Sequence, residues 1–512
     1  MPTMQFYPKA RQPRPSIHHP SVQPLRMSVL KAASINVLLL QFLFLGLFCY
    51  LFGSLFQQTT HVHNMNILFV DYDGGAIGSA VRAANQQLKS PGFPSLIEQP
   101  PPDYPQTTKI DNAVCNIKYW AALYVVSNAS DRLAAALGGG SAASAYNQSN
   151  ILFIVWNQAR YPTVADASIY GSVESLSQAA RVAFTQAGGK QIIQALNSSD
   201  PGAIAVFSNP WTLSSINIQP TTQGSRLVYN TLVIILILIQ EFFFLGSING
   251  LYQQFRLYTL VASHRIAIVR LILSGVYTFL GSLCTTGAIW AFRHGWHVNG
   301  SQFVLNWMTL WLFAHLNFLV LDVFSIWVSP PFVPMALISW VVLNVTSILL
   351  PFELSPGFYR WGYALPAHSV FQVLVDNWSG GCNPQLNFAL PVMFAYEVIG
   401  LVLSCIGVYR RAHYASIKQE VDEKQLQERV EAAIAEQEER QLARETTRQE
   451  IQGSETEEEG ISPMQRRGTI TTLEDQEELA GRIRQGVSHS ELGRVVTSRE
   501  SIGPSFNLAF TR

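Results

Sequence analysis

Five ionisable side chains lie inside segments that are otherwise apolar, and they are the residues of this chain best placed to do chemistry. They are Glu241, Arg270, His315, Asp322 and Glu397. Charged groups are costly inside a membrane, so an ionisable residue there indicates a transport path, a proton relay or a structural partner. This set predicts a polar site within a bundle of apolar helices.

The predicted depth of each residue in the membrane sorts these five residues into two pairs and one single residue. With a rise of about 1.5 Å per residue, Arg270 and Asp322 lie at matched depth near the cytoplasmic ends of their segments, which predicts a structural ion pair. His315 and Glu397 both lie near the midplane, where they could relay protons or join two helices by a hydrogen bond. Glu241 would line a cavity or make a helix–helix contact.

Six apolar segments must position these residues, since a bilayer core takes roughly 20 helical residues to cross. The predicted crossings are 34–56, 227–248, 267–291, 303–327, 333–352 and 388–409. The first is longer than the core of a signal peptide and lacks a cleavage site, which indicates an uncleaved anchor. Residues 1–33 carry Lys and Arg but no acidic residue, so we expect a cytoplasmic N-terminus and, after six crossings, a cytoplasmic C-terminus.

Charge is scarce outside the C-terminal region. Charged residues make up 13% of the chain and hydrophobic residues 48%, whereas soluble proteins carry about 25% charged residues. The net charge is zero, which excludes the basic footprint of a nucleic-acid binder. The long uncharged segments exclude a plain soluble enzyme. We expect an α-helical integral membrane protein with one crossing followed by five in 227–409. Its expected partner is the lipid bilayer.

Residues 57–226 have the composition of a soluble, extracytoplasmic domain. Apolar runs at 65–71, 118–126 and 151–156 predict strands separated by helices, which favours an α/β or α+β domain. N-glycosylation sequons lie in this domain and in the predicted outer loops, in agreement with that topology. The candidate acceptors are Asn128, Asn147, Asn197, Asn299 and Asn377, while Asn344 lies within a predicted crossing.

The third outer loop, 353–387, is apolar but interrupted by prolines, and it predicts a re-entrant or interfacial helix. Cys382 in this loop and Cys115 in the outer domain both face an oxidising compartment, so they form either a disulfide or two free thiols. On the cytoplasmic side, 410–452 predicts a charged helix and 453–512 a disordered tail. Thr469 follows Arg466-Arg467-Gly468 and is a candidate phosphorylation site.

Motifs of catalysis are absent from the sequence. The string Gly188-Gly189-Lys190-Gln191 lacks the first glycine and the hydroxyl of a P-loop, and there is no G-x-S-x-G elbow. His61 and His63 would supply only two metal ligands, so an exposed pair is the simpler interpretation. Asp71 and Asp73 flank a tight turn, where carboxylates usually cap the turn and the following helix. We therefore expect no enzyme, no metal and no cofactor.

Four strings, in order along the chain, carry a resemblance to a known family. They are NILFVDYDG at 66–74, KYWAALYV at 118–125, NIQP at 217–220 and WGYALPAH at 361–368. With the arrangement of one anchor, an outer domain and five crossings, the chain resembles the fungal nitrosoguanidine-resistance membrane protein family. More distantly it is similar to phage-infection proteins and to type-2 ABC exporter permeases. The resemblance implies a plasma-membrane glycoprotein of drug resistance, a re-entrant third outer loop and, since type-2 permeases work as pairs, a homodimer.

Three hypotheses of function follow. The leading one is export or translocation of hydrophobic small molecules or lipids, driven by a separate ATPase subunit or an ion gradient because the chain has no ATPase of its own. The alternative is a non-transporting organiser or regulator of the membrane that acts through the outer domain and the tail. The third, an ectoenzyme anchored by its helices, lacks a catalytic constellation.

Overall fold

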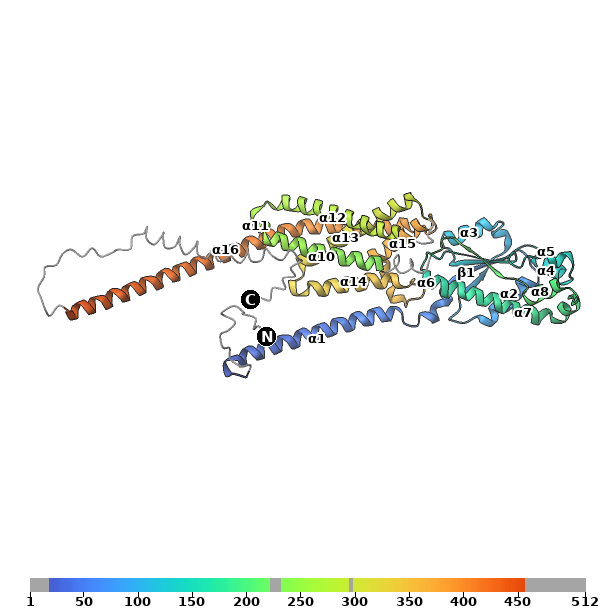
Figure 1. Ribbon diagram of the computed structural model, residues 1–512, viewed down its shortest axis with the longest axis horizontal. Helices are drawn as coiled ribbons and strands as arrows, with labels where there is room; N and C mark the ends of the chain where they lie inside the picture. The colour runs from blue at the N-terminus through green and yellow to red at the C-terminus, as the bar shows by residue number, and fades with distance from the viewer. Residues whose placement is uncertain (1–17, 222–231, 294–297, 456–512) are drawn as a thin grey trace, which may run out of the picture. The chain divides into compact units, whose positions relative to one another are not determined.

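The structure is a computed structural model that describes residues 18–221, 232–293 and 298–455, and it is mostly helical with one small sheet (Figure 1). The prediction of apolar helices combined with a small α/β domain is thus confirmed. By internal contacts the chain divides into two compact units. Unit 1 contains Met1–Leu236, Cys284–Phe313 and Pro334–Phe394, and unit 2 contains Ile237–Leu283, Ala314–Val333 and Ala395–Arg512.

Five helices of the described chain are long and apolar enough to cross a membrane. They are α1 (Gln23–Ser54), α10 (Val233–Gln254), α12 (Ser263–Ala291), α13 (Gly300–Trp327) and the 386–432 part of α16 (Leu386–Glu455). A helix satisfies all its backbone groups internally, which is the requirement that hydrocarbon imposes on a spanning segment. The predicted start of the second crossing, 227–231, lies outside the described residues.

The remaining predicted crossing, 333–352, forms the shorter helix α14 (Val333–Leu349). Its 17 residues extend over about 25 Å at 1.5 Å each, less than the roughly 30 Å of a bilayer core. The helix ends early because Pro351 disfavours helical geometry in the residue before it. Six crossings therefore stay a prediction, with five supported by length and composition.

Helix α16 corrects the predicted division between a crossing at 388–409 and a separate charged helix at 410–452. It is one continuous helix of 70 residues (Figure 1). The sequence has no glycine or proline from 408 to 452, so no helix-breaking residue separates the apolar part of the helix from the charged part. Residues 456–512, including Thr469 and most of the predicted disordered tail, lie outside the described residues.

The outer domain contains a five-stranded sheet in the order β2-β1-β3-β4-β5. The strands are β1 (Asn66–Asp71), β2 (Ser95–Glu98), β3 (Ala121–Val125), β4 (Leu152–Trp156) and β5 (Leu213–Asn217). All neighbouring pairs are parallel except β3 with β4. The three predicted strands are present, whereas β2 and β5 were not predicted, because each is a short edge strand without a fully buried apolar run.

Helices cover both faces of this sheet. Leu68, Val70 and Ala122 pack with α3 (Thr107–Cys115) on one face. Helices α2 (Ala76–Leu88) and α7 (Gly171–Ala195) pack against each other on the opposite side (Figure 1). The shorter helices of unit 1 are α4 (Ala129–Leu137), α5 (Ser141–Ala145), α6 (Pro162–Val164), α8 (Pro201–Ser208) and α15 (Pro366–Trp378), and unit 2 adds α11 (Leu257–Leu260).

The third outer loop folds into α15 and is part of the core of unit 1. Every residue of α15 except Asn377 is buried, which is the burial of a core helix rather than of one lying on a lipid surface. A disulfide joins Cys115 at the end of α3 to Cys382 just after α15. Asn157 Nδ2 also donates to Cys382 O, at 3.3 Å. The re-entrant and the interfacial placement of this loop both stay predictions.

Candidate functional site

All five ionisable residues of the apolar segments lie in unit 2, on four different helices. Glu241 is on α10, Arg270 on α12, His315 and Asp322 on α13, and Glu397 on α16. The structure brings together Arg270 with Asp322 and His315 with Glu397. Within the described residues, Glu241 forms no salt bridge. The site thus has two hydrogen-bonded centres and one separate carboxyl group.

Asp322 lies between two arginines. Its Oδ1 is 2.6 Å from Arg270 Nη2 and 3.1 Å from Arg411 Nη1, and its side chain is completely buried. Ser404 Oγ donates to the other carboxylate oxygen at 2.5 Å. A buried carboxylate is stable only when both its charge and its lone pairs have partners. These three donors provide both, so Asp322 is held as a structural anion.

Arg411 was not predicted as part of the site, because it follows the predicted end of the last crossing and resembles the usual positive cytoplasmic flank. Since α16 continues without a break, Glu397, Ser404 and Arg411 follow one another at intervals of seven residues. Residues seven apart lie on the same face of a helix, two turns from each other. That spacing is the sequence signal that would have identified both Ser404 and Arg411.

The cluster around Asp322 carries more positive than negative charge. The other hydrogen-bond partners of the two arginines are neutral: Asn249 Oδ1 accepts from Arg270 Nη2 at 2.8 Å, and Ser325 Oγ accepts from Arg411 Nη2 at 2.6 Å. Two guanidinium groups therefore face one carboxylate. Arg270 is only 2% exposed, yet its Nε and Nη1 have no hydrogen-bond partner in the described part of the chain.

The second centre is a row of three side chains from α16, α13 and α12. His315 Nδ1 lies 2.6 Å from Glu397 Oε1, and His315 Nε2 lies 3.3 Å from Ser274 Oγ. Ser274 Oγ in turn donates to Leu271 O at 3.0 Å. The imidazole is therefore held between a carboxyl group, which can exchange a proton with it, and a hydroxyl group, which forms a hydrogen bond with it.

The hydrogen bonds define which nitrogen of His315 carries a proton. A hydroxyl has one hydrogen, and Ser274 uses it on Leu271 O, so Ser274 must accept from an Nε2–H of His315. The bond between Nδ1 and Glu397 then has two equivalent forms: imidazolium with carboxylate, or neutral imidazole with carboxylic acid. Both forms are neutral overall and keep the same contacts, so one proton can move across this pair without rearrangement.

Two carboxyl oxygens in this region lack partners. Glu241 is 1% exposed, and its Oε2 has no hydrogen-bond partner within the described residues; the same holds for Glu397 Oε2. Glu241 lies one helical turn before Phe244, whose ring stacks on Tyr277 of α12 with centroids 3.7 Å apart. An unpartnered buried oxygen is a position at which a proton or a ligand donor can bind.

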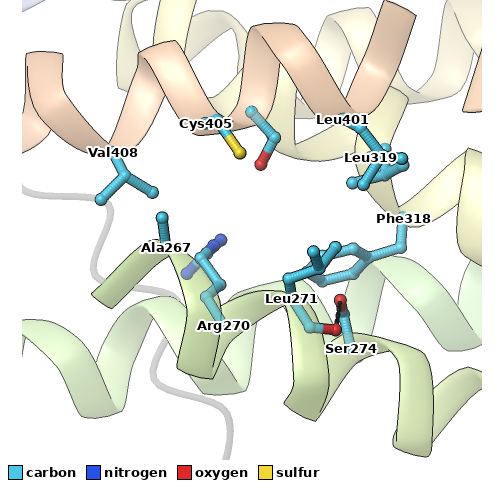
Figure 2. Close-up of a pocket in the computed structure, with 10 residues that line it drawn as sticks. Ala267, Arg270, Leu271, Ser274, Phe318, Leu319, Leu401, Cys405 and Val408 are labelled. Atoms are coloured by element: carbon cyan, nitrogen blue, oxygen red, sulfur yellow. Dashed lines mark hydrogen bonds between the residues drawn. The ribbon is translucent and has the colours of Figure 1, made fainter. Parts of the chain in front are cut away.

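A small cleft connects the two centres (Figure 2). It is lined by residues of α12, α13 and α16, among them Arg270 and Ser404 from the first centre and Ser274 from the second. Figure 2 shows the Arg270 guanidinium directed toward the space bounded by Cys405 and Val408. The cleft has room for about one water molecule. It is the place where a bound group would contact both centres.

The candidate glycosylation sites differ in access. The exposed acceptors are Asn128, Asn147, Asn197 and Asn299. Asn377 is half-buried, and its Nδ2, the atom that a glycan would occupy, donates to Gln302 O at 2.8 Å. Asn344 on α14 is fully buried. Modification at the first four acceptors is compatible with this fold, whereas modification at Asn377 would break a hydrogen bond.

Asp71 and Asp73 hold the turn after β1. Asp71 Oδ1 accepts from the backbone nitrogens of Asp73 and Gly74 at 3.1 and 3.0 Å, and Asp73 Oδ1 accepts from Ser130 N at 2.9 Å. Asp73 Oδ2 also accepts from Gly75 N at 3.2 Å, so both carboxylates cap the turn as expected, whereas neither of them caps the start of the following helix α2. His61 Nδ1 lies 3.0 Å from Gln57 O, and no group of three metal-ligating side chains includes it among the described residues.

Comparison with known proteins gives a family of unknown function and an uncharacterised curated relative. Residues 36–402 match the model of a family described as "Protein of unknown function (DUF3533)". The chain is also 22% identical, over 70% of its length and 76% of the relative's, to an "Uncharacterized endoplasmic reticulum membrane protein" of Saccharomyces cerevisiae. No solved structure matches. A membrane protein is therefore supported, in agreement with the apolar helices.

Proposed function

This chain belongs to the DUF3533 family, and we propose that it exports or translocates hydrophobic small molecules or lipids, using proton movement instead of an ATPase of its own. The observation that carries the proposal is the buried row Glu397–His315–Ser274 inside apolar helices. Ionisable groups at such positions are costly and typically belong to proton or substrate paths. The resemblance to resistance proteins and type-2 permeases supports the same class of function.

The His315–Glu397 pair gives a physical means of coupling. With one shared proton the pair is neutral, and without it the pair carries a negative charge that an apolar environment disfavours. Proton uptake therefore favours the state in which the pair is closed off from water, and proton release favours a state in which it is open. Substrate movement along the apolar faces of the same helices would be linked to that exchange.

Efflux from cells tests this proposal. Fluorescent hydrophobic drugs and labelled lipids would be followed in cells that express the full chain, with the proton gradient intact and then collapsed. We expect gradient-dependent efflux that is lost in Glu397→Gln and reduced in Glu241→Gln. Glu420→Gln is the matched control, because Glu420 is exposed on the same helix. Identical efflux in all strains, at equal surface abundance, would contradict the proposal.

The long cytoplasmic part of α16 favours the alternative, a membrane organiser or regulator. From Arg410 to Glu455 the helix continues for about 70 Å at 1.5 Å per residue, and its described side chains from Lys418 to Gln425 are exposed. Truncation after Glu450 would remove the rest of the predicted docking tail. Loss of drug resistance on truncation, with unchanged efflux, would favour the organiser over the translocator.

The proposed location is the plasma membrane, with both termini in the cytoplasm and a homodimer as the assembly. The family resemblance supports this location, whereas the yeast relative is named as a protein of the endoplasmic reticulum. Fluorescence imaging of the tagged full chain distinguishes the two compartments. Sensitivity to glycosidase should be lost when the five candidate acceptors are all changed to Gln, namely Asn128, Asn147, Asn197, Asn299 and Asn377. Retained sensitivity would place glycans elsewhere and would contradict the proposed topology.

A further inference from the structure

The surplus positive charge beside Asp322 is located on Arg270. Arginine has five N–H donors, and the two on Nη2 are used by Asp322 Oδ1 and Asn249 Oδ1. Those on Nε and Nη1 have no partner among the described residues, although the side chain is 2% exposed. The rings of Tyr252 and Phe318, 5.6 and 5.8 Å from Arg270 Cζ, provide only partial compensation. An anion would supply both the missing acceptor and the missing charge.

The cleft in front of Arg270 determines the size of group that fits. It holds about one water molecule, so a single oxygen atom of a larger anionic group can enter and meet the guanidinium. Guanidinium groups bind phosphate oxygens through short, charge-assisted hydrogen bonds. No acidic side chain lines the cleft, so nothing in its lining repels such an oxygen.

The edge of the cleft determines where the rest of the ligand lies. Cys405 on α16 is exposed, and Leu271 on α12 is 38% exposed. Toward the midplane the same two helices present Ile272 and Val402, which are 61% and 55% exposed. These side chains belong to predicted crossings, so the medium outside them is the acyl region of the bilayer. A molecule with its oxygen at Arg270 would therefore extend along an apolar surface.

We propose that the cleft between α12 and α16 binds the phosphate headgroup of an anionic membrane lipid, with one phosphate oxygen on Arg270 and the acyl chains along Ile272 and Val402. This inference deepens the proposed function, because it names an anionic phospholipid as the ligand. Free phosphate shares the headgroup chemistry but not the chains, so the two sources can be separated by experiment.

The test measures lipid binding to the purified full chain in neutral detergent. Short-chain phosphatidate, phosphatidylcholine and inorganic phosphate would be titrated separately, with thermophoresis as the readout. Ala267 lines the cleft, so Ala267→Leu fills it without changing any charge, and exposed Ala288 on the same helix gives the control Ala288→Leu. We expect phosphatidate to bind about tenfold more tightly than phosphatidylcholine, the change that one charge-assisted hydrogen bond produces.

Ala267→Leu should remove that preference and Ala288→Leu should keep it. A second variant, Arg270→Gln, removes the guanidinium and leaves Asp322 held by Arg411 and Ser404, and it should also abolish the preference. Three results would overturn the inference. They are equal binding of both lipids, an unchanged preference in Ala267→Leu, and competition by inorganic phosphate as strong as by phosphatidate. The assay measures binding and not transport, so the two proposals fail independently. Export without selective lipid binding would overturn this inference alone. Selective lipid binding without export would overturn the proposed function alone.

Discussion

Two buried aspartates of this protein are paired with arginine, one in the outer domain and one in the apolar helices, and their surroundings differ. Asp71 Oδ2 lies 2.7 Å from Arg82 Nη2, and Arg82 also pairs with Glu98 at 2.7 Å. The side chains of Arg82 and Glu98 are 38% and 46% exposed. Asp71, Arg82 and Glu98 together carry one net negative charge, and water solvates it. Asp322 has the opposite balance, two arginines for one acid, and its side chain is completely buried.

The difference indicates what each group contributes. In the outer domain the aspartate mainly holds a turn through backbone N–H groups, and an exposed ion pair adds little. In the apolar helices the same residue type neutralises a buried cation, and a partner left alone there has no water to replace the lost interaction. The turn at Asp71 is therefore secured by local, satisfied contacts, whereas the cluster around Asp322 leaves donors of Arg270 without acceptors among the described residues.

The largest effect should follow from removing the buried acid. Asp322→Ala leaves Arg270 and Arg411 without an anion, which should destabilise the protein by about 3–5 kcal/mol. The expected result is loss of most folded protein from the membrane fraction and a lowered melting temperature in detergent. Normal abundance with an unchanged melting temperature would show that the cluster does not hold the helices together.

The disulfide between Cys115 and Cys382 should have the next largest effect. Cross-links of native domains typically contribute about 2–4 kcal/mol, so Cys115→Ser with Cys382→Ser should lower the stability of the outer region by that amount. Thermal unfolding with and without reductant measures it. Wild-type protein that reductant destabilises to the level of the double variant would support the bridge, whereas wild-type protein insensitive to reductant would contradict it.

A pH effect should arise from His368 on α15. Burial lowers the pKa of this imidazole from 6.5 to about 4, although its hydrogen bond to Ser347 O acts in the opposite direction. Below pH 6.5 the unfolded chain takes up a proton that the folded one does not, so stability falls as the pH decreases through this window. The total loss is about 3 kcal/mol. Chemical unfolding at several pH values should show this slope, and His368→Gln should flatten it.

The smallest effect on stability should come from the ion pair between Asp71 and Arg82, which is accessible to water. In Asp71→Asn the amide oxygen still accepts from Asp73 N and Gly74 N, while Arg82 keeps Glu98 and access to water. We expect a loss of about 1 kcal/mol or less. The comparison with Asp322→Asn, measured in parallel by thermal unfolding, sharpens the contrast between the regions. Equal losses would mean that solvent access does not decide the role of these aspartates.

Several elements of the site were predictable from the sequence because they follow from depth alone. Arg270 and Asp322 lie at matched distances from the ends of apolar segments, and His315 and Glu397 lie near the middle of theirs. A helix has a fixed rise per residue, so distance along the chain converts directly into depth. The strands β1, β3 and β4 were predictable for a similar reason, since each is a short, buried apolar run.

The remaining features depend on tertiary packing. The edge strands β2 and β5 are defined by hydrogen bonds to β1 and β4, which a local pattern does not reveal. Arg411 resembled a cytoplasmic flank until α16 was seen to continue through it. Depth also does not specify the direction in which a helix faces, so the contact of Ser274 with His315 and the unused donors of Arg270 required the structure.

The most direct test of the central claim is proton flux in liposomes that contain only the purified full chain. With a pH gradient imposed and a pH-sensitive dye inside, addition of a hydrophobic drug substrate should accelerate collapse of the gradient in the wild type. The acceleration should be absent in Glu397→Gln and present in Glu420→Gln. Drug-independent flux, or drug-stimulated flux of equal size in Glu397→Gln, would contradict proton-coupled translocation through the His315–Glu397 pair.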